Sequence, residues 1–251
     1  MIIHGYTENY LHRPDRKSKI EVITVHSLQG NESTLDSIDE WYRKRIRAGY
    51  ASCSNYAVSF DGKVGQYVPD GKRAATSSSS RNDDRALTVE CATLAGQDKP
   101  RYKLYDKTRE ALVDLLEYLC RKYKKTGLTM LTKETRFDAP PEGTFGVTLH
   151  RWFADTDCPG NDVLEKLPGI ILEVNGRLRP KSVFYRVQTG VFTERGNAEK
   201  EKSRVKGAYI EHEDGYYRVY AGAYTYRKNA EKKVSQLKLL GVPAIIREFR
   251  R

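Results

Sequence analysis

Residues 148–160 read TLHRWFADTDCPG and place His150 and Cys158 eight positions apart, in a loop that closes on Pro159 and Gly160. An imidazole nitrogen and a thiolate sulfur are both good zinc ligands. One loop can direct two ligands at the same ion, but a tight site needs a third ligand from elsewhere. The stretch therefore predicts part of a metal site, and the remainder must come from another part of the chain.

The candidate for the third ligand is His26, which ends the apolar run Val-Ile-Thr-Val at residues 22–25. A short run rich in β-branched residues predicts a buried strand, here over about residues 20–25. At the end of that strand, His26 would lie where functional side chains often collect. Two histidines and one cysteine leave the fourth zinc position open for water, as in catalytic rather than structural zinc sites.

Each of these ligands also has an ordinary interpretation. A lone buried cysteine usually packs as a small hydrophobic residue. A lone histidine usually lies at the surface or is held by hydrogen bonds. The chain has five histidines, so residue types alone leave both interpretations open.

The composition is that of a globular chain of 251 residues, with 39% hydrophobic and 31% charged residues. This length allows one large domain, or one of about 170 residues and a small one. No apolar run approaches the roughly 20 residues that a membrane-spanning helix needs, so we expect no membrane insertion. The N-terminal residues become polar almost at once and lack the apolar core of a secretory signal.

Charge and cysteine usage narrow the range of partners. A net charge of +11 favours solubility and would attract either nucleic acid or an anionic cell wall. No helix-turn-helix, zinc-finger pair or other nucleic-acid-binding motif appears, so we predict no nucleic-acid partner. The cysteines show neither a disulfide framework nor CxxC spacing, which favours synthesis in a reducing compartment; they are Cys53, Cys91, Cys120 and Cys158.

Local patterns in the first part of the chain predict a helix and a hairpin. The helix should be capped by Ser33 or Thr34 and run to about Arg47. Two strand-like runs on either side of Asp61 and Gly62 predict a hairpin with a primed turn. The apolar stripe expected on the helix consists of Leu35, Ile38, Trp41, Tyr42 and Ile46.

The polar segment SSSSRNDD at residues 77–84 has two interpretations. It can be a flexible linker, or it can form a groove wall whose hydroxyls and amides contact a sugar-peptide ligand. Residues 86–93 predict another buried strand, which carries Glu90 within an apolar run. A buried glutamate is rare unless it has a partner or a task.

Two further helices are predicted before residue 180. Asp106 is the expected cap of a long helix that ends before Gly127. A shorter helical segment should cover about residues 162–178, with an interruption at Pro168 and Gly169. The leucine-rich face of the first helix indicates a core contact.

An internal repeat begins beyond residue 182. The triplet YRV at residues 185–187 returns at 217–219, and NAEK at 197–200 returns at 229–232, both after 32 positions. Each copy reads strand, turn, helix and strand. The pair therefore predicts the βαββαβ order of a small α+β, ferredoxin-like domain.

The motifs in the first part of the chain occur in one order: the His26 strand, the Asp-Gly hairpin, the strand around Glu90, and the loop from His150 to Cys158 with its Pro-Gly tail. Over about residues 1–178 this order resembles the zinc-dependent N-acetylmuramoyl-L-alanine amidases of the phage-lysozyme and peptidoglycan-recognition-protein type. Within that group it is most like phage or prophage endolysins. The resemblance implies an α/β fold, with a mixed central sheet flanked by helices, and a bound Zn²⁺.

The same resemblance implies roles for individual positions. His26, His150 and Cys158 match the zinc ligands of the family. Glu90 matches the glutamate that acts as general base in some branches. Thr156 matches a position that is lysine in some members and threonine in others. With zinc activating a water, Glu90 would move the protons and the Thr156 hydroxyl would help to hold the oxyanion.

A hairpin tyrosine takes part in catalysis in some members of the family. The gapless match to that tyrosine falls on Ser54, and Tyr56 lies two positions further along the chain. The resemblance therefore leaves the participation of Tyr56 open.

Residues 182–251 resemble the SPOR domain, a small peptidoglycan-binding module. YRVQTGVF at residues 185–192 and YRVYAGAY at 217–224 match its repeated strands, with Tyr220 where the first copy has Gln188. SPOR domains bind glycan strands that have lost their stem peptides, which is the product of an amidase. The expected domains are a zinc amidase domain at 1–178, a linker at 179–182 and a SPOR-like domain at 183–251.

The two resemblances together imply a peptidoglycan hydrolase that cleaves the amide between N-acetylmuramic acid and L-alanine. Its expected partner is peptidoglycan, through both stem peptide and glycan strand. Lacking a secretory signal, it should be made in the cytoplasm of a bacterial host and reach the wall by holin-dependent release. Two alternatives stay open: a non-lytic peptidoglycan-binding protein and a bacterial cell-wall remodelling amidase. Nothing in the sequence favours a particular oligomeric state.

Overall fold

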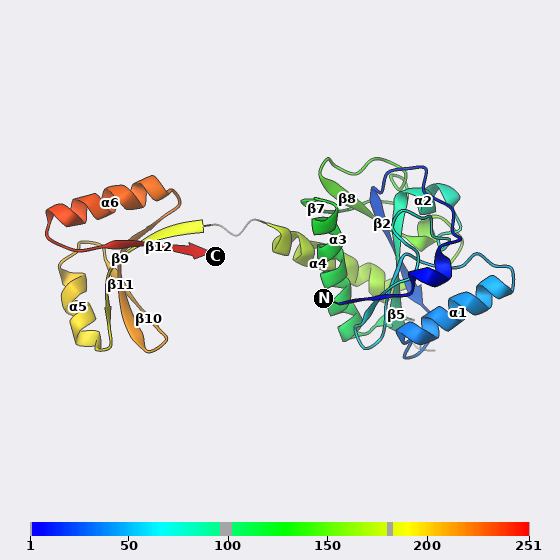
Figure 1. Cartoon of the computed structure of the whole chain (residues 1–251), viewed down its shortest axis with the longest axis horizontal. Helices are drawn as coiled ribbons and strands as arrows, with labels where there is room; N and C mark the ends of the chain where they lie inside the picture. Colours follow the sequence, from blue (N-terminus) through cyan, green and yellow to red (C-terminus); the bar gives the residue numbers. More distant parts are fainter. Residues whose placement is uncertain (1, 96–101, 180–182, 251) are drawn as a thin grey trace. The chain divides into compact units, whose positions relative to one another are not determined.

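A computed structural model describes residues 2–95, 102–179 and 183–250, and Figure 1 shows its helices and strands. The chain divides into two units, Met1–Arg179 and Pro180–Arg251. Each unit has hydrophobic clusters of its own. The linker predicted at residues 179–182 lies, apart from Arg179, outside the described residues.

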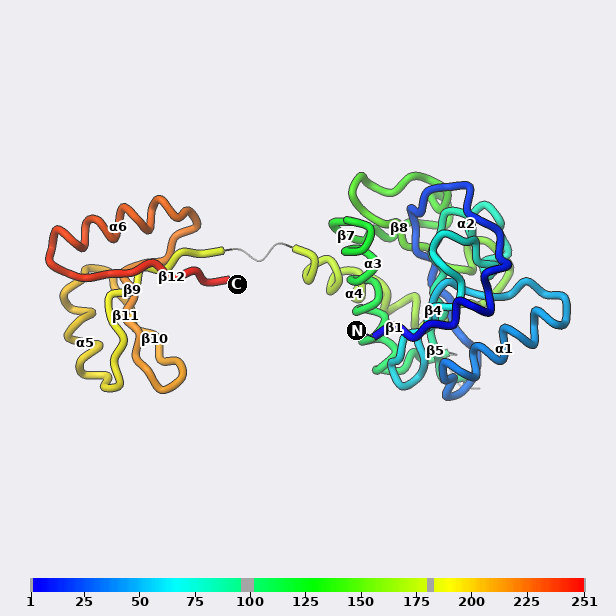
Figure 2. The backbone as a smooth tube through the Cα atoms, viewed as in Figure 1, coloured from blue at the N-terminus to red at the C-terminus, as the bar shows by residue number. Residues whose placement is uncertain are grey.

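The first unit is built on a mixed sheet with the strand order β1-β4-β3-β5-β2-β8-β7, to which β6 adds by pairing with β5. The pairings of β3, β5, β2, β8 and β7 along this path are parallel, and only β3–β4 and β5–β6 are antiparallel. In Figure 2 the N-terminal strand runs beside β4, where Ile3 is in register with Val64. The strands are β1 (Ile3–Gly5), β2 (Val22–Leu28), β3 (Tyr56–Val58), β4 (Val64–Gln66), β5 (Ala86–Leu94), β6 (Lys103–Leu104), β7 (Gly127–Met130) and β8 (Thr144–Leu149).

Helices pack on both faces of this sheet (Figure 1). Ile23 and Val25 of β2 belong to the larger cluster, which also contains the apolar faces of α3 and α4. The second cluster joins Ile38 and Tyr42 of α1 to the N-terminal segment. The predicted α/β fold with a mixed sheet flanked by helices is therefore confirmed. The helices are η1 (Thr7–Tyr10), α1 (Leu35–Arg47), α2 (Ser80–Arg85), α3 (Asp106–Lys122), η2 (His150–Trp152) and α4 (Asn161–Leu178).

Helix α1 begins as predicted, because the Thr34 side chain caps it by accepting a hydrogen bond from the Ser37 amide. The predicted apolar stripe is only partly correct, because Trp41, which was assigned to it, is 45% exposed. The hairpin exists, but its turn is not of the primed type. The Gly62 amide donates to the Ser59 carbonyl, and of the turn residues only glycine has a positive φ, +82°. A three-residue connection needs this one left-handed position, whereas a primed turn would require Asp61 to have a positive φ as well.

The interpretation of residues 77–84 as a flexible linker is wrong. Ser79 caps α2 by accepting a hydrogen bond from the Asn82 amide. Asp83 is buried and accepts a 2.7 Å hydrogen bond from the Ser77 hydroxyl. The serines that suggest a linker are therefore partners of the first turn of a short helix.

The two later helices also differ from prediction. Tyr105, not Asp106, is the N-cap residue of α3, and Gly127 begins β7 instead of ending the helix. Helix α4 continues through Pro168 without interruption. Proline removes one amide donor from a helix, and the buried face of α4 supplies enough packing to keep the remaining turns together. Strands β1, β6, β7 and β8 were not predicted.

The second unit has the predicted βαββαβ order. Its sheet order is β10-β11-β9-β12 with antiparallel neighbours throughout. Strands β9 and β10 are therefore parallel to each other with β11 between them, which is the split βαβ arrangement. The elements are β9 (Val183–Phe192), α5 (Arg195–Ser203), β10 (Tyr209–Glu213), β11 (Tyr216–Tyr224), α6 (Arg227–Leu239) and β12 (Ile245–Arg250).

The repeat has a packing explanation. Val187 and Val219 occupy matching positions on β9 and β11, and Ala198 and Ala230 occupy matching positions on α5 and α6; all four are fully buried. The small alanine side chains at the two helix positions let each helix approach the sheet closely. None of the helices in the described parts of the chain is long and apolar enough to cross a membrane.

Candidate metal centre and cleft

Three neighbouring parallel strands bring the predicted site residues to one edge of the sheet. Strands β5, β2 and β8 are adjacent, so their C-terminal ends lie together. His26 is in register with Glu90 across β2 and β5, and Val25 is in register with Leu149, the last residue of β8. His150 follows Leu149 directly, so it emerges beside His26.

His26 lies within β2, which extends to Leu28, and not at the end of the strand as predicted. Alternation along the strand decides where its side chain points. Ile23 and Val25 pack in the core beneath α3 and α4. Thr24 and His26 point to the other face of the sheet, away from α3 and α4. There the Thr24 hydroxyl contacts the Thr148 hydroxyl at 2.8 Å. His26 is therefore directed away from the main core and towards the cleft.

His26, His150 and Cys158 form a cluster in which the potential ligand atoms all lie within 4.8 Å of one another. Cys158 Sγ is 3.9 Å from His26 Nδ1, and the centroids of the two imidazole rings are 4.6 Å apart. The Nε2 atoms of both histidines are buried and have no hydrogen-bond partner among the described residues. Two imidazoles and one sulfur form a ligand set that zinc prefers, and the unpartnered nitrogens fit a metal ion.

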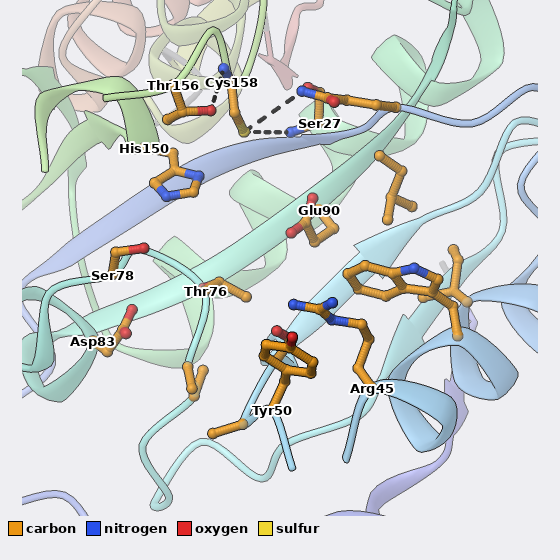
Figure 3. A pocket seen from close by; sticks show the side chains of 18 of the residues that line it. Ser27, Arg45, Tyr50, Thr76, Ser78, Asp83, Glu90, His150, Thr156 and Cys158 are labelled. Carbon is orange, nitrogen blue, oxygen red and sulfur yellow. Dashed lines mark hydrogen bonds between the residues drawn. The ribbon is translucent and has the colours of Figure 1, made fainter. Parts of the chain in front are cut away.

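The loop that carries Cys158 is fastened on both sides. The Arg151 amide donates to the Cys158 carbonyl at 3.0 Å, and the Arg151 guanidinium donates to Asn161 Oδ1 at 2.9 Å. The Ser27 amide donates to Cys158 Sγ at 3.2 Å, and the Cys158 amide donates to Thr156 Oγ1 at 3.2 Å (Figure 3). These bonds position the sulfur beside β2, and no described residue accepts the Thr156 hydroxyl hydrogen.

Burial sets the protonation states of the three clustered residues. It lowers the pKa of His150, and burial together with the neighbouring His150 lowers the pKa of His26 well below its ordinary value. Both imidazoles are therefore neutral near pH 7, the form that binds a metal. Burial and the nearby Glu90 raise the pKa of the Cys158 thiol to about 12, against the hydrogen bonds from Ser27. A metal ion would have to displace that proton on binding.

Glu90 stands next to the cluster on β5. Its Oε1 is 4.0 Å from His26 Nδ1, and its buried Oε2 has no hydrogen-bond partner within the described residues. Burial raises the pKa of this carboxyl to about 8. A carboxyl group with a pKa close to the working pH can both accept and return a proton.

A cleft of about 990 Å³ opens at this edge of the sheet, lined by Glu90, His150, Thr156 and Cys158 (Figure 3). Residues 78–80, at the start of α2, form part of its wall. The groove-wall interpretation of that serine-rich segment therefore agrees with its position, although its last serine, Ser80, begins α2. A cleft of this size accommodates a peptide or sugar fragment.

The cleft-lining residues that sequence reasoning missed include Trp41, Arg45 and Tyr50. Trp41 and Arg45 are four positions apart on α1 and so share one face of the helix. That spacing was the available signal, but it placed Trp41 in the apolar stripe. The hairpin residues lie elsewhere: the Tyr56 hydroxyl donates to Asp70 at 2.7 Å, and the Ser54 hydroxyl contacts Tyr42 at 2.7 Å.

Comparison with known proteins identifies the family. The sequence profile of N-acetylmuramoyl-L-alanine amidases matches residues 16–161. The chain belongs to this family. The SPOR-domain profile matches residues 176–248, so the resemblance of the C-terminal part to SPOR domains is also confirmed. The amidase is accordingly a peptidoglycan hydrolase with a SPOR domain.

One solved structure with a TM-score above 0.5 agrees with this fold, and two others are similar to parts of the chain. The amidase is similar to the Staphylococcus aureus hydrolase AmiA in complex with its ligand, at 13% identity and a TM-score of 0.52, over 71% of this chain and 83% of that chain. It is similar to the endolysin LysCS from Clostridium intestinale URNW at 17% identity and a TM-score of 0.49, over 67% of this chain and 93% of that chain. It is also similar to the peptidoglycan-binding domain of the B. subtilis cell wall lytic enzyme CwlC, at 31% identity and a TM-score of 0.27, over 28% of this chain and 95% of that domain. No curated protein matches.

Replacing Glu90 by Gln should change how the stability of the metal-free amidase depends on pH. The pKa of this carboxyl is raised from its ordinary value of 4.5 to about 8. Below pH 4.5 both folded and unfolded chains hold the proton, so the contribution of Glu90 to stability is complete. Between pH 4.5 and about 8 only the unfolded chain releases it, and the free energy of unfolding falls. Metal-free Glu90→Gln should therefore become increasingly more stable than the wild type over this window.

Urea unfolding in the presence of chelator at pH 4.5, 6 and 8 would measure the effect. Glu40→Gln removes an exposed carboxylate from α1 and is the matched control. A stability difference between Glu90→Gln and the wild type that stays constant across this pH range would show that burial of Glu90 does not shift its titration.

Proposed function

We propose that the amidase binds Zn²⁺ through His26, His150 and Cys158 and hydrolyses the amide between N-acetylmuramic acid and L-alanine. One observation supports this most directly: two buried, neutral imidazoles and a sulfur converge within 4.8 Å at the wall of a cleft. A zinc ion held there supplies a Lewis acid that lowers the pKa of bound water to about 7. The remaining steps are assigned to residues of the chain itself.

Glu90 is the proposed proton carrier. Its carboxyl lies next to His26 and lines the cleft, where an attacking water must also lie. A cation close by favours the ionised form, so the pKa of Glu90 should fall when metal is bound. The carboxylate then accepts a proton from the attacking water and delivers it to the leaving amine of L-alanine. This second transfer matters because an unprotonated amine is a poor leaving group.

Thr156 is the proposed oxyanion donor. Its Oγ1 already accepts a hydrogen bond from the Cys158 amide, so the orientation of the side chain is set before substrate arrives. The hydroxyl hydrogen remains available for the oxygen of the tetrahedral intermediate. A donor fixed in advance requires little rearrangement during the reaction, which is why such groups accelerate acyl transfer.

The SPOR domain is proposed to hold the amidase on its substrate by binding glycan strands without stem peptides. A tethered second binding site raises the effective concentration of the catalytic unit at the wall. The net charge of +11 supports retention on an anionic polymer.

The resemblance to phage and prophage endolysins supports a lytic role, and holin-dependent release remains a prediction from that resemblance. A non-lytic peptidoglycan receptor is disfavoured because the proposed ligand set is complete. A bacterial remodelling amidase would use the same chemistry and differs only in its biological setting.

Digestion of purified sacculi with and without a chelator tests the proposed reaction. The zinc-loaded amidase should release new N-terminal L-alanine amines and leave the number of sugar reducing ends unchanged. Chelator should abolish the release, and added Zn²⁺ should restore it. New reducing ends, or activity that survives complete removal of metal, would contradict the proposal.

The two proposed catalytic residues should fail in different ways. Glu90→Gln should keep its zinc but lower kcat about 10²- to 10⁴-fold, because the proton carrier is lost. Thr156→Val should lower kcat about 10²- to 10³-fold with little change in KM, because the hydroxyl acts mainly on the oxyanion. Zinc content and steady-state kinetics on a soluble muramoyl peptide would measure both. Thr225→Val, an exposed threonine of the second unit, is the control. Near wild-type kcat in either variant would remove that residue from the mechanism.

Deleting residues 183–251 should weaken binding to sacculi while leaving hydrolysis of a short soluble muramoyl peptide unchanged. The clusters of the first unit contain no residue from the second, so the catalytic unit should fold without it. Co-sedimentation with sacculi before and after removal of stem peptides would measure binding. Equal sedimentation of full-length and shortened chains would exclude a targeting role.

A further inference from the structure

The cleft is lined by arginines that do not form ion pairs within the described structure. Arg13, Arg45 and Arg73 line it, whereas its acidic lining residues are Asp83 and Glu90. Within the described parts of the chain, none of the three arginines forms an ion pair within 4.0 Å. Asp83 is occupied by the Ser77 hydroxyl and amide. The cleft therefore contains cationic groups that are available to bind an anionic ligand.

Arg45 is the arginine whose position is best defined. Its guanidinium carbon lies 3.7 Å from the centroid of the Tyr50 ring and 5.9 Å from that of Trp41. The Tyr50 amide donates to the Arg45 carbonyl at 3.0 Å, which folds Tyr50 back against the end of α1. Figure 3 shows the guanidinium stacked on the Tyr50 ring with its end turned towards the interior of the cleft. Such stacking holds the plane of the group and leaves its N–H edge free.

Two further observations indicate that a ligand is missing from this arrangement. Arg45 Nε is buried and has no hydrogen-bond partner among the described residues. The rings that support the guanidinium, Trp41 and Tyr50, are 45% and 54% exposed. A buried unpaired donor beside exposed aromatic surface is unfavourable unless another molecule covers both.

A favourable contact with the helix dipole does not account for this geometry. Basic residues stabilise the last turn of a helix, and α1 carries Lys44, Arg45 and Arg47 there. Arg47 meets that requirement from an exposed position. Only Arg45 among these residues lines the cleft and is held by aromatic rings. Arg47 is therefore a natural control for the charge alone.

The chemistry of the substrate identifies the anion. In intact peptidoglycan the lactyl carboxyl of muramic acid is part of the scissile amide, so the sugar side of that bond is uncharged. The stem peptide carries free carboxylates beyond its first alanine. A planar guanidinium binds a carboxylate through two parallel hydrogen bonds. We propose that the Arg45 side of the cleft receives the stem peptide and that Arg45 binds one of its carboxylates, which makes Arg45 a specificity determinant. This inference rests on the proposed function.

Kinetics on four soluble muramoyl tripeptides test the proposal. The reference compound has D-glutamate with a free α-carboxylate as its second residue and diaminopimelate as its third. In each of the other three, one carboxylate is removed: the α-carboxylate of D-glutamate is amidated, diaminopimelate is replaced by lysine, or the terminal carboxylate is amidated. These compounds distinguish which of the carboxylates Arg45 binds.

Arg45→Met should lower kcat/KM on the reference compound by about 10- to 100-fold, mainly through KM, because a charged hydrogen bond is lost. On the one compound that lacks the recognised carboxylate, Arg45→Met and wild type should be equal. Arg45→Lys keeps the charge without the planar group and should fall between them. Arg47→Met should match the wild type on all four compounds.

Zinc content and thermal unfolding of each variant show that the site and the fold are intact. If Arg45→Met lowers kcat/KM by the same factor on all four compounds, or on none, Arg45 does not bind a stem-peptide carboxylate, and the proposed amide hydrolysis still stands. If the zinc-loaded wild type cleaves none of the compounds and releases no L-alanine amines from sacculi, the proposed function fails, and this inference fails with it.

Discussion

The parallel register of β2 with β5 and β8 is the constraint on which the candidate site depends. It sets His26 opposite Glu90 and brings the end of β8 beside them. Because side chains alternate along a strand, a slip of one residue would turn His26 into the core and an apolar residue into the cleft. The register is reinforced on the cleft face, where Thr24 contacts Thr148 at 2.8 Å and accepts a 2.9 Å hydrogen bond from Asn82.

The same register also buries several polar atoms together without hydrogen-bond partners, which is unfavourable for the folded state. The Nε2 atoms of His26 and His150 and the Oε2 atom of Glu90 are buried without hydrogen-bond partners in the described structure. The thiol of Cys158 is buried next to them. A folded protein rarely leaves so many polar atoms unpaired in one place unless the site has a function. A single cation bound by one nitrogen of each imidazole and by the sulfur would also favour the ionised form of Glu90, so one binding event would stabilise several of these groups together.

How much of this site could be predicted depends on the kind of residue. His26, His150, Cys158 and Glu90 could be singled out because imidazole, thiol and buried carboxyl groups are rare in apolar runs and have few chemical uses. Their convergence could not be calculated from the sequence, since it depends on strand order. Arg45 was missed because arginine is common on helix surfaces, and its significance comes only from the rings and the cleft around it.

The fold was predictable where burial leaves a clear pattern. Val187 and Val219 recur because each is buried in the same layer of the second unit, and the repeat therefore reports the fold directly. Prediction failed where a local rule was outweighed by tertiary contacts. Ser79 of the serine-rich segment caps α2 and Ser80 begins it, and α4 passes through Pro168 because one face of the helix is buried. Trp41 followed the helical period but faces the cleft, since periodicity identifies a face and not what covers it.

In the proposed function, the two units recognise opposite states of the same polymer. The arginine-lined cleft binds carboxylates of the stem peptide, and these carboxylates leave with the peptide when it is released. The SPOR domain binds what remains, a glycan without charges from the peptide. Product binding at the second unit therefore does not compete for the groups that hold substrate at the first. Each turnover would create another anchoring site and leave the catalytic cleft empty, so retention on the wall would increase as hydrolysis proceeds without inhibiting it.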